Sequence, residues 1–360
     1  MLVSLSETVV IAPNFKKRLS GVTSTIVHLI PLQRAQGVHI ATLGMGLPDY
    51  LPQLSWSSLG HLWKQPPGHP FRIWHARRNV EMIVGIIMRD ILCMKVRLIF
   101  TSASQRHHKP LTRWLIRRMD RVIATSVRSS SYLKVPHTVI MHGVDLEYFT
   151  PPTTKKNEFL ASGIPGKYAI GCFGRIRYQK GTDLFVDAMI ALLPRYPEWT
   201  AIIAGRTTAK HQKFEKALKE KIAAANMMSR IIFLGEVRNV HDWYQHLTLY
   251  VAPSRNEGFG LTPLEAMASQ TAVVTSDAGA YTELVGPGSG TVVPAGNGIA
   301  LQKAIESYLA DPIQTIAAGR IALAHVRSAF PLIKEVIAIH AVYNNLLMSS
   351  NKPKDALYNP

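Results

Sequence analysis

Short apolar runs alternate with longer helical patterns along nearly the whole chain. A strand buried inside a parallel sheet appears as a continuous apolar run, whereas a covering helix repeats its apolar residues with a period near 3.6. The alternation therefore predicts α/β architecture, with parallel sheets covered by helices.

The strands and helices can be placed by this alternation in both halves of the chain. In the first half, strands are predicted over Thr8–Ala12, His39–Leu43, Phe71–Trp74, Arg97–Phe100, Val122–Thr125 and Thr138–Met141, and helices over Val22–Arg34, Arg77–Met94 and Thr112–Arg118. In the second half, strands are predicted over Tyr168–Phe173, Trp199–Ala204, Ile231–Leu234, Leu249–Ala252, Ala272–Thr275 and Thr291–Val293. Helices are predicted there over Thr182–Leu193, Lys210–Ala224, Val240–His246, Pro263–Ser269 and Ile299–Leu309.

A segment rich in proline, threonine and lysine, residues 150–156, separates the two halves and has no apolar period, as expected of a linker. We predict an N-terminal domain over 1–150, a linker over 151–167 and a C-terminal domain over 168–330. A helix and tail over 331–360 should pack back across the junction. Two doubly wound domains joined in this way would face a central cleft, with ligands beyond the carboxyl ends of the strands.

Composition restricts the class of protein. The length of 360 residues fits two domains, and 47% hydrophobic with 18% charged residues indicates a globular chain. Only two cysteines occur, far apart, which predicts a reducing compartment. The opening residues lack the pattern of a secretory signal, and the apolar stretch Met82–Met94 contains Arg89 and Asp90. We therefore expect a soluble or peripheral protein.

The net charge of +18 is distributed unevenly. Residues 1–150 hold 19 basic and 7 acidic residues, whereas residues 151–360 hold 22 and 16. An anionic partner of the N-terminal half is indicated: a nucleic acid, a membrane surface or an acidic substrate. A merely basic, soluble surface is the alternative.

The segment Pro253–Ala268 is the strongest motif in the chain. It follows a strand, passes Gly258 and Gly260, and enters a helix that Thr262 could cap and Pro263 could begin. A glycine-rich turn before a helix presents unpaired backbone N–H groups, which suit a phosphate.

Two carboxylates flank this turn. Glu265 could simply form a capping box with Thr262. Glu257 does not help to bind phosphate and makes better sense as an acceptor for sugar hydroxyls beside it. Together the two could hold the hydroxyls at both ends of a nucleotide-sugar.

The spacing from Glu257 to Glu265, with Gly-Phe-Gly-Leu-x-Pro-Leu between them, resembles glycosyltransferase family 4, which has the two-domain GT-B fold. The resemblance extends over most of the chain and implies that Glu265 binds the ribose hydroxyls. It also implies that Glu257 contacts the transferred sugar and acts in catalysis. The backbone of Gly258, Phe259 and Gly260 would lie near the sugar or the phosphate.

A second element, Gly171–Gly181, matches the family's Gly-Arg…Lys-Gly pattern. Arg175 and Lys180 are therefore the expected ligands of the donor diphosphate, with Arg177 a weaker candidate. A solvated basic loop is the alternative. No Asp-x-Asp triplet and no His/Cys cluster with metal spacing occurs in the sequence, so we expect no cofactor and no metal site, and the two cations would replace Mg²⁺.

The N-terminal half supplies further candidates. Gly21 precedes a predicted helix where the family usually carries two glycines near the donor phosphate; ordinary loop chemistry is the alternative. His75 ends a predicted strand, and the family's recurring histidine there implies that it positions the transferred sugar or orients the reacting groups; a structural histidine is the alternative. Arg77 and Arg78, beside it, are candidates for binding an acidic acceptor. Surface charge at the start of a helix is the alternative.

The element Trp74–Asn79 and the chain length are similar to those of bacterial lipopolysaccharide-core mannosyltransferases. This implies retaining transfer of mannose from GDP-mannose to an anionic glycolipid, such as the Kdo-containing inner core, by a cytoplasmic enzyme peripheral to the inner membrane face.

Three alternatives remain. One is a UDP-sugar-dependent glycosyltransferase for another polysaccharide or glycolipid, and another is a sugar phosphorylase or synthase of the same fold. The third is a basic nucleic-acid-binding protein. Its basic segments lack interleaved aromatic residues, and it leaves Glu257 and Glu265 unexplained, so we expect no nucleic-acid partner.

Overall fold

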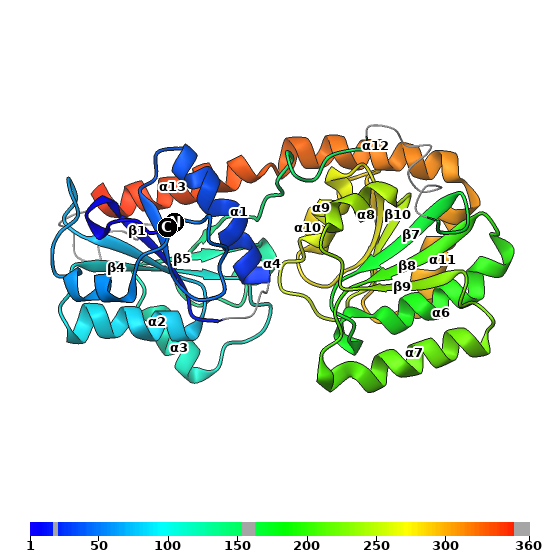
Figure 1. Cartoon of the computed structure of the whole chain (residues 1–360), viewed down its shortest axis with the longest axis horizontal. Coiled ribbons are helices and arrows are strands. Elements are labelled where there is room, and N and C mark those ends of the chain that lie inside the picture. Colours follow the sequence, from blue (N-terminus) through cyan, green and yellow to red (C-terminus); the bar gives the residue numbers. More distant parts are fainter. Residues whose placement is uncertain (17–20, 153–162, 349–360) are drawn as a thin grey trace. The chain divides into compact units, whose positions relative to one another are not determined.

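The computed structural model describes residues 1–16, 21–152 and 163–348. It separates into two compact units (Figure 1). Unit 1 comprises Met1–His142 together with the chain from Leu332 onward, and unit 2 comprises Gly143–Pro331. Each unit contains a six-stranded sheet in which every strand pair is parallel, with helices on both faces. The two doubly wound units confirm the predicted α/β class.

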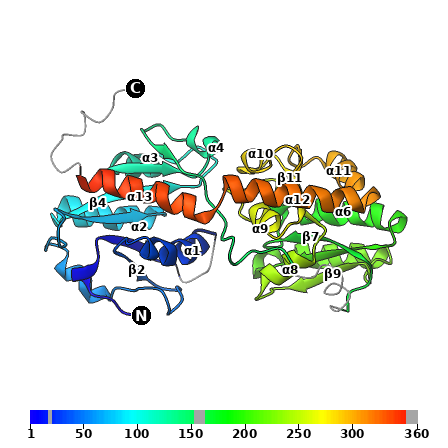
Figure 2. The same ribbon diagram turned by 90° about the horizontal axis from the view of Figure 1, so that it is seen from above.

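Unit 1 has the strand order β2-β1-β3-β4-β5-β6. Its strands are β1 Val10–Asn14, β2 Ile40–Gly44, β3 Arg72–Ala76, β4 Val96–Ser102, β5 Arg121–Ala124 and β6 Thr138–Val139. Its helices are α1 Gly21–Ala35, α2 Asn79–Ile86, α3 Pro110–Arg117, α4 Val127–Ser130 and α13 Leu332–Met348. Helices α1 and α13 contact each other and cover one face, while α2 and α3 contact each other on the opposite face (Figures 1 and 2).

Unit 2 has the strand order β12-β11-β10-β7-β8-β9. Its strands are β7 Tyr168–Phe173, β8 Trp199–Ala204, β9 Ile231–Gly235, β10 Leu249–Ala252, β11 Ala272–Ser276 and β12 Gly290–Val293. Its helices are α6 Thr182–Leu192, α7 Gln212–Ala224, α8 Val240–His246, α9 Thr262–Ala268, α10 Tyr281–Leu284, α11 Gly298–Ala310 and α12 Pro312–Ala329. Helix α6 packs with α7 and α11, and α9 packs with α8 and α12.

Short helical turns accompany these elements in both units. They are η1 Leu5–Glu7, η2 Trp56–His61, η3 Ile87–Ile91, η4 Tyr178–Lys180, η5 Leu193–Arg195 and η6 Ala209–His211. The turn η3 has π-helical geometry and directly follows α2, so the helix predicted over Arg77–Met94 is shorter and changes its hydrogen-bonding pattern after Ile86.

The division between the units differs from the predicted domains at the first boundary. Unit 2 begins at Gly143 and not after Thr150, because the intervening segment is fastened to unit 2. The Val144 N–H donates to the Phe330 carbonyl at 2.9 Å, and Phe149 packs edge-on against Tyr244. Of the linker predicted over 151–167, residues 153–162 lie outside the described residues.

The C-terminal helix α13 belongs to unit 1 and is part of its core. Val336, Ile339 and Tyr343 are buried in the same apolar cluster as Ile26 and Ile30 of α1. The apolar residues of α13 recur at helical spacing, so one side of the helix can be buried against the sheet. The predicted tail beyond 348 lies outside the described residues.

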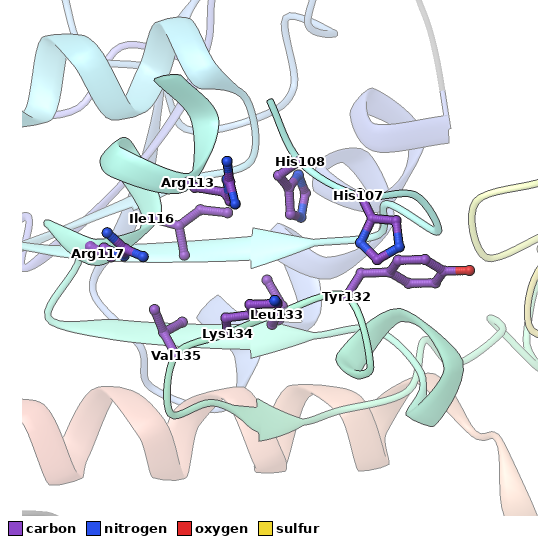
Figure 3. A pocket seen from close by; sticks show the side chains of 9 residues that line it. All are labelled: His107, His108, Arg113, Ile116, Arg117, Tyr132, Leu133, Lys134 and Val135. Carbon is purple, nitrogen blue, oxygen red and sulfur yellow. The ribbon is translucent and has the colours of Figure 1, made fainter. Parts of the chain in front are cut away.

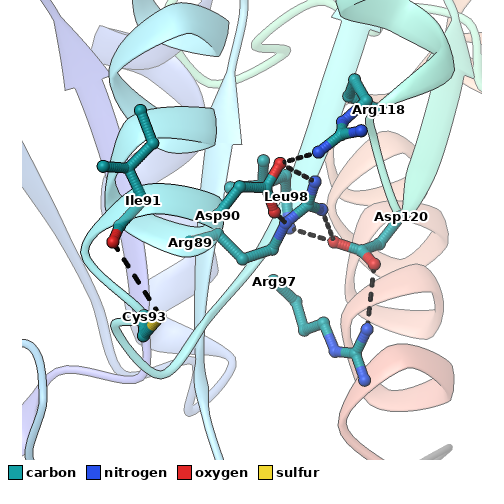
Figure 4. A network of polar contacts seen from close by, with 8 residues as sticks. All are labelled: Arg89, Asp90, Ile91, Cys93, Arg97, Leu98, Arg118 and Asp120. Carbon is teal, nitrogen blue, oxygen red and sulfur yellow. Dashed lines mark hydrogen bonds and ion pairs between the residues drawn. The ribbon is translucent and has the colours of Figure 1, made fainter.

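A network of charged side chains ties together η3, β4 and the start of β5 (Figure 4). The buried carboxylate of Asp120 accepts hydrogen bonds from the Leu98 N–H at 2.8 Å, from Arg89 at 2.8 Å and from Arg97 at 3.0 Å. Asp90 pairs with Arg89 at 2.6 Å, and this hydrogen bond is the main reason why the pKa of Asp90 is lowered to about 2. The charges that interrupt the apolar stretch Met82–Met94 therefore have a structural role.

No helix among the described residues is both long enough and apolar enough to span a bilayer.

Replacing Asp120 with alanine should lower the free energy of unfolding by about 3 kcal/mol, because the Leu98 N–H and two arginines would lose a buried acceptor. Urea denaturation followed by circular dichroism measures this change. The exposed Asp49→Ala is the matched control and should change stability by less than about 0.5 kcal/mol. Equal effects of the two substitutions would show that the network contributes nothing.

Candidate active site

The chain changes direction across the sheet of unit 2 between β7 and β10. From β7 it continues to β8 and β9 on one side, and then returns to place β10 on the other side of β7. The connections that leave β7 and β10 therefore diverge and open a crevice at the carboxyl ends of these strands, where ligands of doubly wound proteins bind. The two strongest sequence motifs follow these two strands.

Lys180, after β7, and Glu257, after β10, contact each other across this point. The Lys180 ammonium donates to Oε2 of Glu257, and the two side chains are only 17% and 16% exposed. The Gly258 N–H donates to Oε1 of the same carboxylate at 3.2 Å. Burial opposes ionisation of Glu257, but Lys180, the Gly258 N–H and the charge of Arg177 outweigh it and lower its pKa. Two predicted donor ligands thus lie side by side.

Two glycines allow these loops to approach. Gly181 has φ +71°, and a Cβ there would lie 1.9 Å from the Pro253 carbonyl oxygen, so the loop after β7 closes directly onto the loop after β10. Gly260 has φ +93°, and a Cβ there would lie 2.2 Å from the ring of Tyr281. A larger residue at Gly181 would force the two loops apart, and one at Gly260 would push the loop after β10 away from Tyr281 of α10.

Glu265 lies on α9 and accepts a hydrogen bond at 2.9 Å from the hydroxyl of Tyr244. The capping alternative fails, because α9 starts at Thr262 itself, its N-cap is Leu261, and no side chain caps it. Loss of solvent around the carboxyl raises the pKa of Glu265 to about 7, although the Tyr244 hydroxyl and Lys180 act in the opposite direction. Glu265 therefore titrates in the physiological range.

The predicted arginines of this loop differ in their surroundings. Arg175 is exposed, whereas Arg177 is partly buried, and its Nε has no hydrogen-bond partner within the described chain. A small cavity between Lys180 and Tyr281 is also lined by Gly174, Ser254 and Thr262. Among the described residues, no group of three or more histidine, cysteine, aspartate or glutamate side chains could hold a metal ion.

Sequence reasoning missed the residues that brace this site. Arg255 donates to both carboxylate oxygens of Asp183 at 2.7 Å, and its guanidinium lies 3.8 Å from the ring centroid of Tyr178. This clamp joins the loop after β10 to the start of α6 and to η4. The arginine stands inside the recognised motif, but nothing local in the sequence points to Asp183 or to the distant Tyr244 as partners.

In unit 1, His75 is the fourth residue of β3 and is fully buried. Its Nδ1 lies 2.6 Å from the Tyr343 hydroxyl of α13, and its Nε2 lies 2.7 Å from the Thr101 hydroxyl at the end of β4. Burial, assisted by the charge of Arg77, holds the pKa of His75 well below its ordinary value. Both nitrogens are thus engaged within the unit, in contrast to the ligand-facing ring expected from the sequence.

The neighbouring arginines also have partners inside unit 1. Arg78 bridges the carboxylate of Glu81 at 2.8 Å and the side chain of Asn14, at the end of β1, at 2.7 Å. Arg77 donates to the His75 carbonyl at 3.3 Å and is partly buried. Gly21 begins α1, and apart from its own helix and neighbours no described residue lies within 4 Å of the position that a Cβ would occupy there. The interpretation of Arg78 as surface charge is therefore wrong.

Two doubly wound units, with the Lys180–Glu257 ion pair between the strand ends of the second, are the architecture expected of a two-domain glycosyltransferase. The sequence profile of the family described as glycosyl transferases group 1 matches residues 154–322. The chain is 60% identical over 339 residues to the lipopolysaccharide core biosynthesis mannosyltransferase LpcC of Rhizobium leguminosarum bv. viciae, covering 94% of this chain and 96% of that protein. The chain belongs to this glycosyltransferase family.

Two further comparisons agree with this assignment. The lipopolysaccharide core biosynthesis mannosyltransferase LpsB of Rhizobium meliloti (strain 1021) is 53% identical over 350 residues, which cover 96% of this chain and all of LpsB. The crystal structure of Anabaena Alr3699/HepE in complex with UDP and glucose matches 93% of this chain and 99% of that one, with a TM-score of 0.78 at 19% identity. The GT-B fold expected from the sequence is confirmed.

The raised pKa of Glu265 predicts a pH-dependent stability. Between the ordinary value of 4.5 and about 7, the folded protein keeps a proton that the unfolded chain has released. This contribution is therefore fully present below pH 4.5 and is lost as the pH rises to about 7. The free energy of unfolding should fall by about 3 kcal/mol over this window, and Glu265→Gln should remove that part of the fall.

Urea denaturation of both proteins at several pH values between 4.5 and 8 measures the difference. The control is Glu220→Gln, whose side chain is 65% exposed and should leave the pH profile unchanged. Parallel profiles for wild type and Glu265→Gln would show that Glu265 ionises normally.

Proposed function

We propose that the chain is a retaining mannosyltransferase that moves mannose from GDP-mannose to a hydroxyl of an anionic glycolipid, such as the Kdo-containing inner core of lipopolysaccharide. The observation that carries the proposal is the 60% and 53% identity, over nearly the full length, to two lipopolysaccharide core mannosyltransferases. The contact between Lys180 and Glu257, beyond the carboxyl ends of β7 and β10, brings together a cation that can bind the diphosphate and a carboxylate that can bind sugar hydroxyls.

The donor would exchange partners with this ion pair. Its diphosphate would take over the Lys180 ammonium, assisted by Arg175 and by Nε of Arg177, which has no hydrogen-bond partner among the described residues. A preorganised positive charge of this kind stabilises the leaving diphosphate as negative charge develops on it. Glu257, released from Lys180 but still hydrogen-bonded by the Gly258 N–H, would then accept hydrogen bonds from sugar hydroxyls and stabilise positive charge on the reacting sugar.

Glu265 would bind the ribose hydroxyls, with Tyr244 holding its carboxyl in place from the opposite side. The backbone N–H groups of Phe259 and Gly260 would lie near the sugar or the phosphate. Because both of its nitrogens are bonded, His75 would act as a positioning residue that joins the ends of β3 and β4 to α13.

Membrane attachment would use the outer surface of α2, η3 and α3. Exposed apolar side chains lie along these elements: Ile83 at 37%, Ile87 at 40%, Ile91 at 69%, Leu111 at 59% and Trp114 at 50%. The exposed cation Lys109 lies beside them, and such a mixture binds the anionic inner leaflet. This arrangement supports a cytoplasmic protein held peripherally on the inner face of the membrane.

Calorimetric titration with GDP-mannose, UDP-glucose and UDP-N-acetylglucosamine tests the choice of donor. GDP-mannose alone should bind, and Lys180→Gln should weaken its binding at least roughly tenfold by removing a charge-assisted contact with the diphosphate. Lys216→Gln, on the exposed surface of α7, is the matched control. Binding of a UDP-sugar alone would exclude the mannosyl assignment and favour a UDP-sugar-dependent transferase. Normal GDP-mannose binding by Lys180→Gln would show that Lys180 is not a donor ligand.

Turnover should not need a divalent metal, because the cations of the loop after β7 would neutralise the leaving diphosphate. Initial rates of mannosyl transfer in EDTA should lie within about twofold of the rates with Mg²⁺. Complete loss of turnover in EDTA, restored by Mg²⁺, would contradict this role for Arg175 and Lys180.

A further inference from the structure

A cavity of about 200 Å³ lies in unit 1, apart from the residues discussed so far (Figure 3). Its walls come from the loop between β4 and α3, from one side of α3, and from the segment between α4 and β6. The volume is smaller than the roughly 300–1,000 Å³ of pockets for drug-sized ligands. A ligand inside it is therefore limited to about the size of one sugar unit.

The charged groups that line the cavity are all basic. Arg113 and Arg117 lie one turn apart on α3, and Lys134 lies on the facing segment; none of the described residues that line the cavity is acidic. In the described part of the chain, these three cations form no ion pair, whereas Arg118 of the same region is bound by Asp90 at 2.5 Å. The cavity therefore concentrates positive charge that the unit does not neutralise itself.

Two histidines and a tyrosine form one wall of the cavity and supply aromatic rings and a hydrogen-bonding nitrogen. The rings of His107 and Tyr132 meet edge to face, with centroids 5.3 Å apart. Nε2 of the neighbouring His108 is buried and has no hydrogen-bond partner among the described residues. The base of the cavity is apolar, with Ile116 and Leu133 buried. An apolar base, an aromatic wall and a few convergent polar groups are typical of a small-molecule site.

We propose that this cavity binds a sugar unit that carries a carboxylate or phosphate group and belongs to the acceptor glycolipid. The inference rests on the proposed function and specifies the part of unit 1 that recognises the acceptor's charge. Arg113, Arg117 and Lys134 bind the anionic group, and Nε2 of His108 pairs with a hydroxyl. The site would select among acceptors by the position of one charged sugar.

Binding of free Kdo to the full chain, measured by calorimetry against mannose as the neutral sugar, tests the site. Kdo should bind and mannose should not. The double variant Arg113→Gln/Arg117→Gln should weaken Kdo binding at least roughly tenfold, because both charge-assisted contacts are lost. The matched control, Lys64→Gln/Lys95→Gln, removes two exposed charges of unit 1 outside the cavity and should bind Kdo normally.

Two further measurements separate the possible outcomes. With Kdo-bearing lipid A as acceptor, the Arg113→Gln/Arg117→Gln variant should show a KM raised at least roughly tenfold, with an unchanged Kd for GDP-mannose that also shows the chain to be folded. Unaltered Kdo binding by this variant, or equal binding of mannose and Kdo, would overturn the proposal.

A phospholipid headgroup is the competing source of an anionic group. Phosphatidylglycerol vesicles supply the probe, and the proposal would also be overturned if the double variant lost vesicle binding while keeping Kdo binding. Failure of the proposed function gives a different result: Kdo would still bind in the cavity, but GDP-mannose would not bind to the chain.

Discussion

A parallel strand can be joined to its neighbour only by a connection that crosses a face of the sheet. In both units this constraint, together with a reversal of strand order, decides where chemistry can occur. The reversal falls between β7 and β10 in unit 2 and between β1 and β3 in unit 1. At each reversal, side chains from two neighbouring strand ends meet: Lys180 with Glu257 in unit 2, and Asn14 with Arg78 in unit 1.

The Lys180–Glu257 contact and the Asn14–Arg78 contact differ in their surroundings. Lys180 and Glu257 are reached through short loops with glycines at the points of closest approach, and some solvent still reaches both side chains. Arg78 instead donates hydrogen bonds to Asn14, Glu81 and Thr23. Its guanidinium is therefore paired within unit 1. The same topology therefore provides a solvent-accessible ion pair in one unit and a buried polar network in the other.

Much of the fold could be predicted because strand burial leaves a local signal. β7, β8 and β10 have the limits expected from their apolar runs. Helix α12 was missed although Asp311 caps it and Pro312 occupies its first turn, because its alanine-rich sequence shows only a weak apolar period. The first boundary was misplaced because the prolines at 151 and 152 mark irregular backbone, whereas the packing already changes at Gly143.

The candidate site, like the fold, could be predicted only in part from the sequence. Lys180 and Glu257 were identified because both lie in motifs that resemble those of the family, and the order of the strands brings the two motifs together. The partners of His75 could not be predicted, since Thr101 and Tyr343 are brought to it only by the assembled sheet and by α13. Likewise, the pKa of Glu265 depends on solvent exclusion by residues distant in the sequence.

The return of the chain from α12 in unit 2 to α13 in unit 1 has a consequence for biosynthesis. Unit 2 is made from one continuous stretch, whereas the core of unit 1 includes Val336, Ile339 and Tyr343 near the end of the chain. During translation, residues 1–142 are made before unit 2, yet Ile26 and Ile30 cannot be buried against α13 until unit 2 has been made as well. The core of unit 1 is thus completed only after the whole of unit 2 has been synthesised.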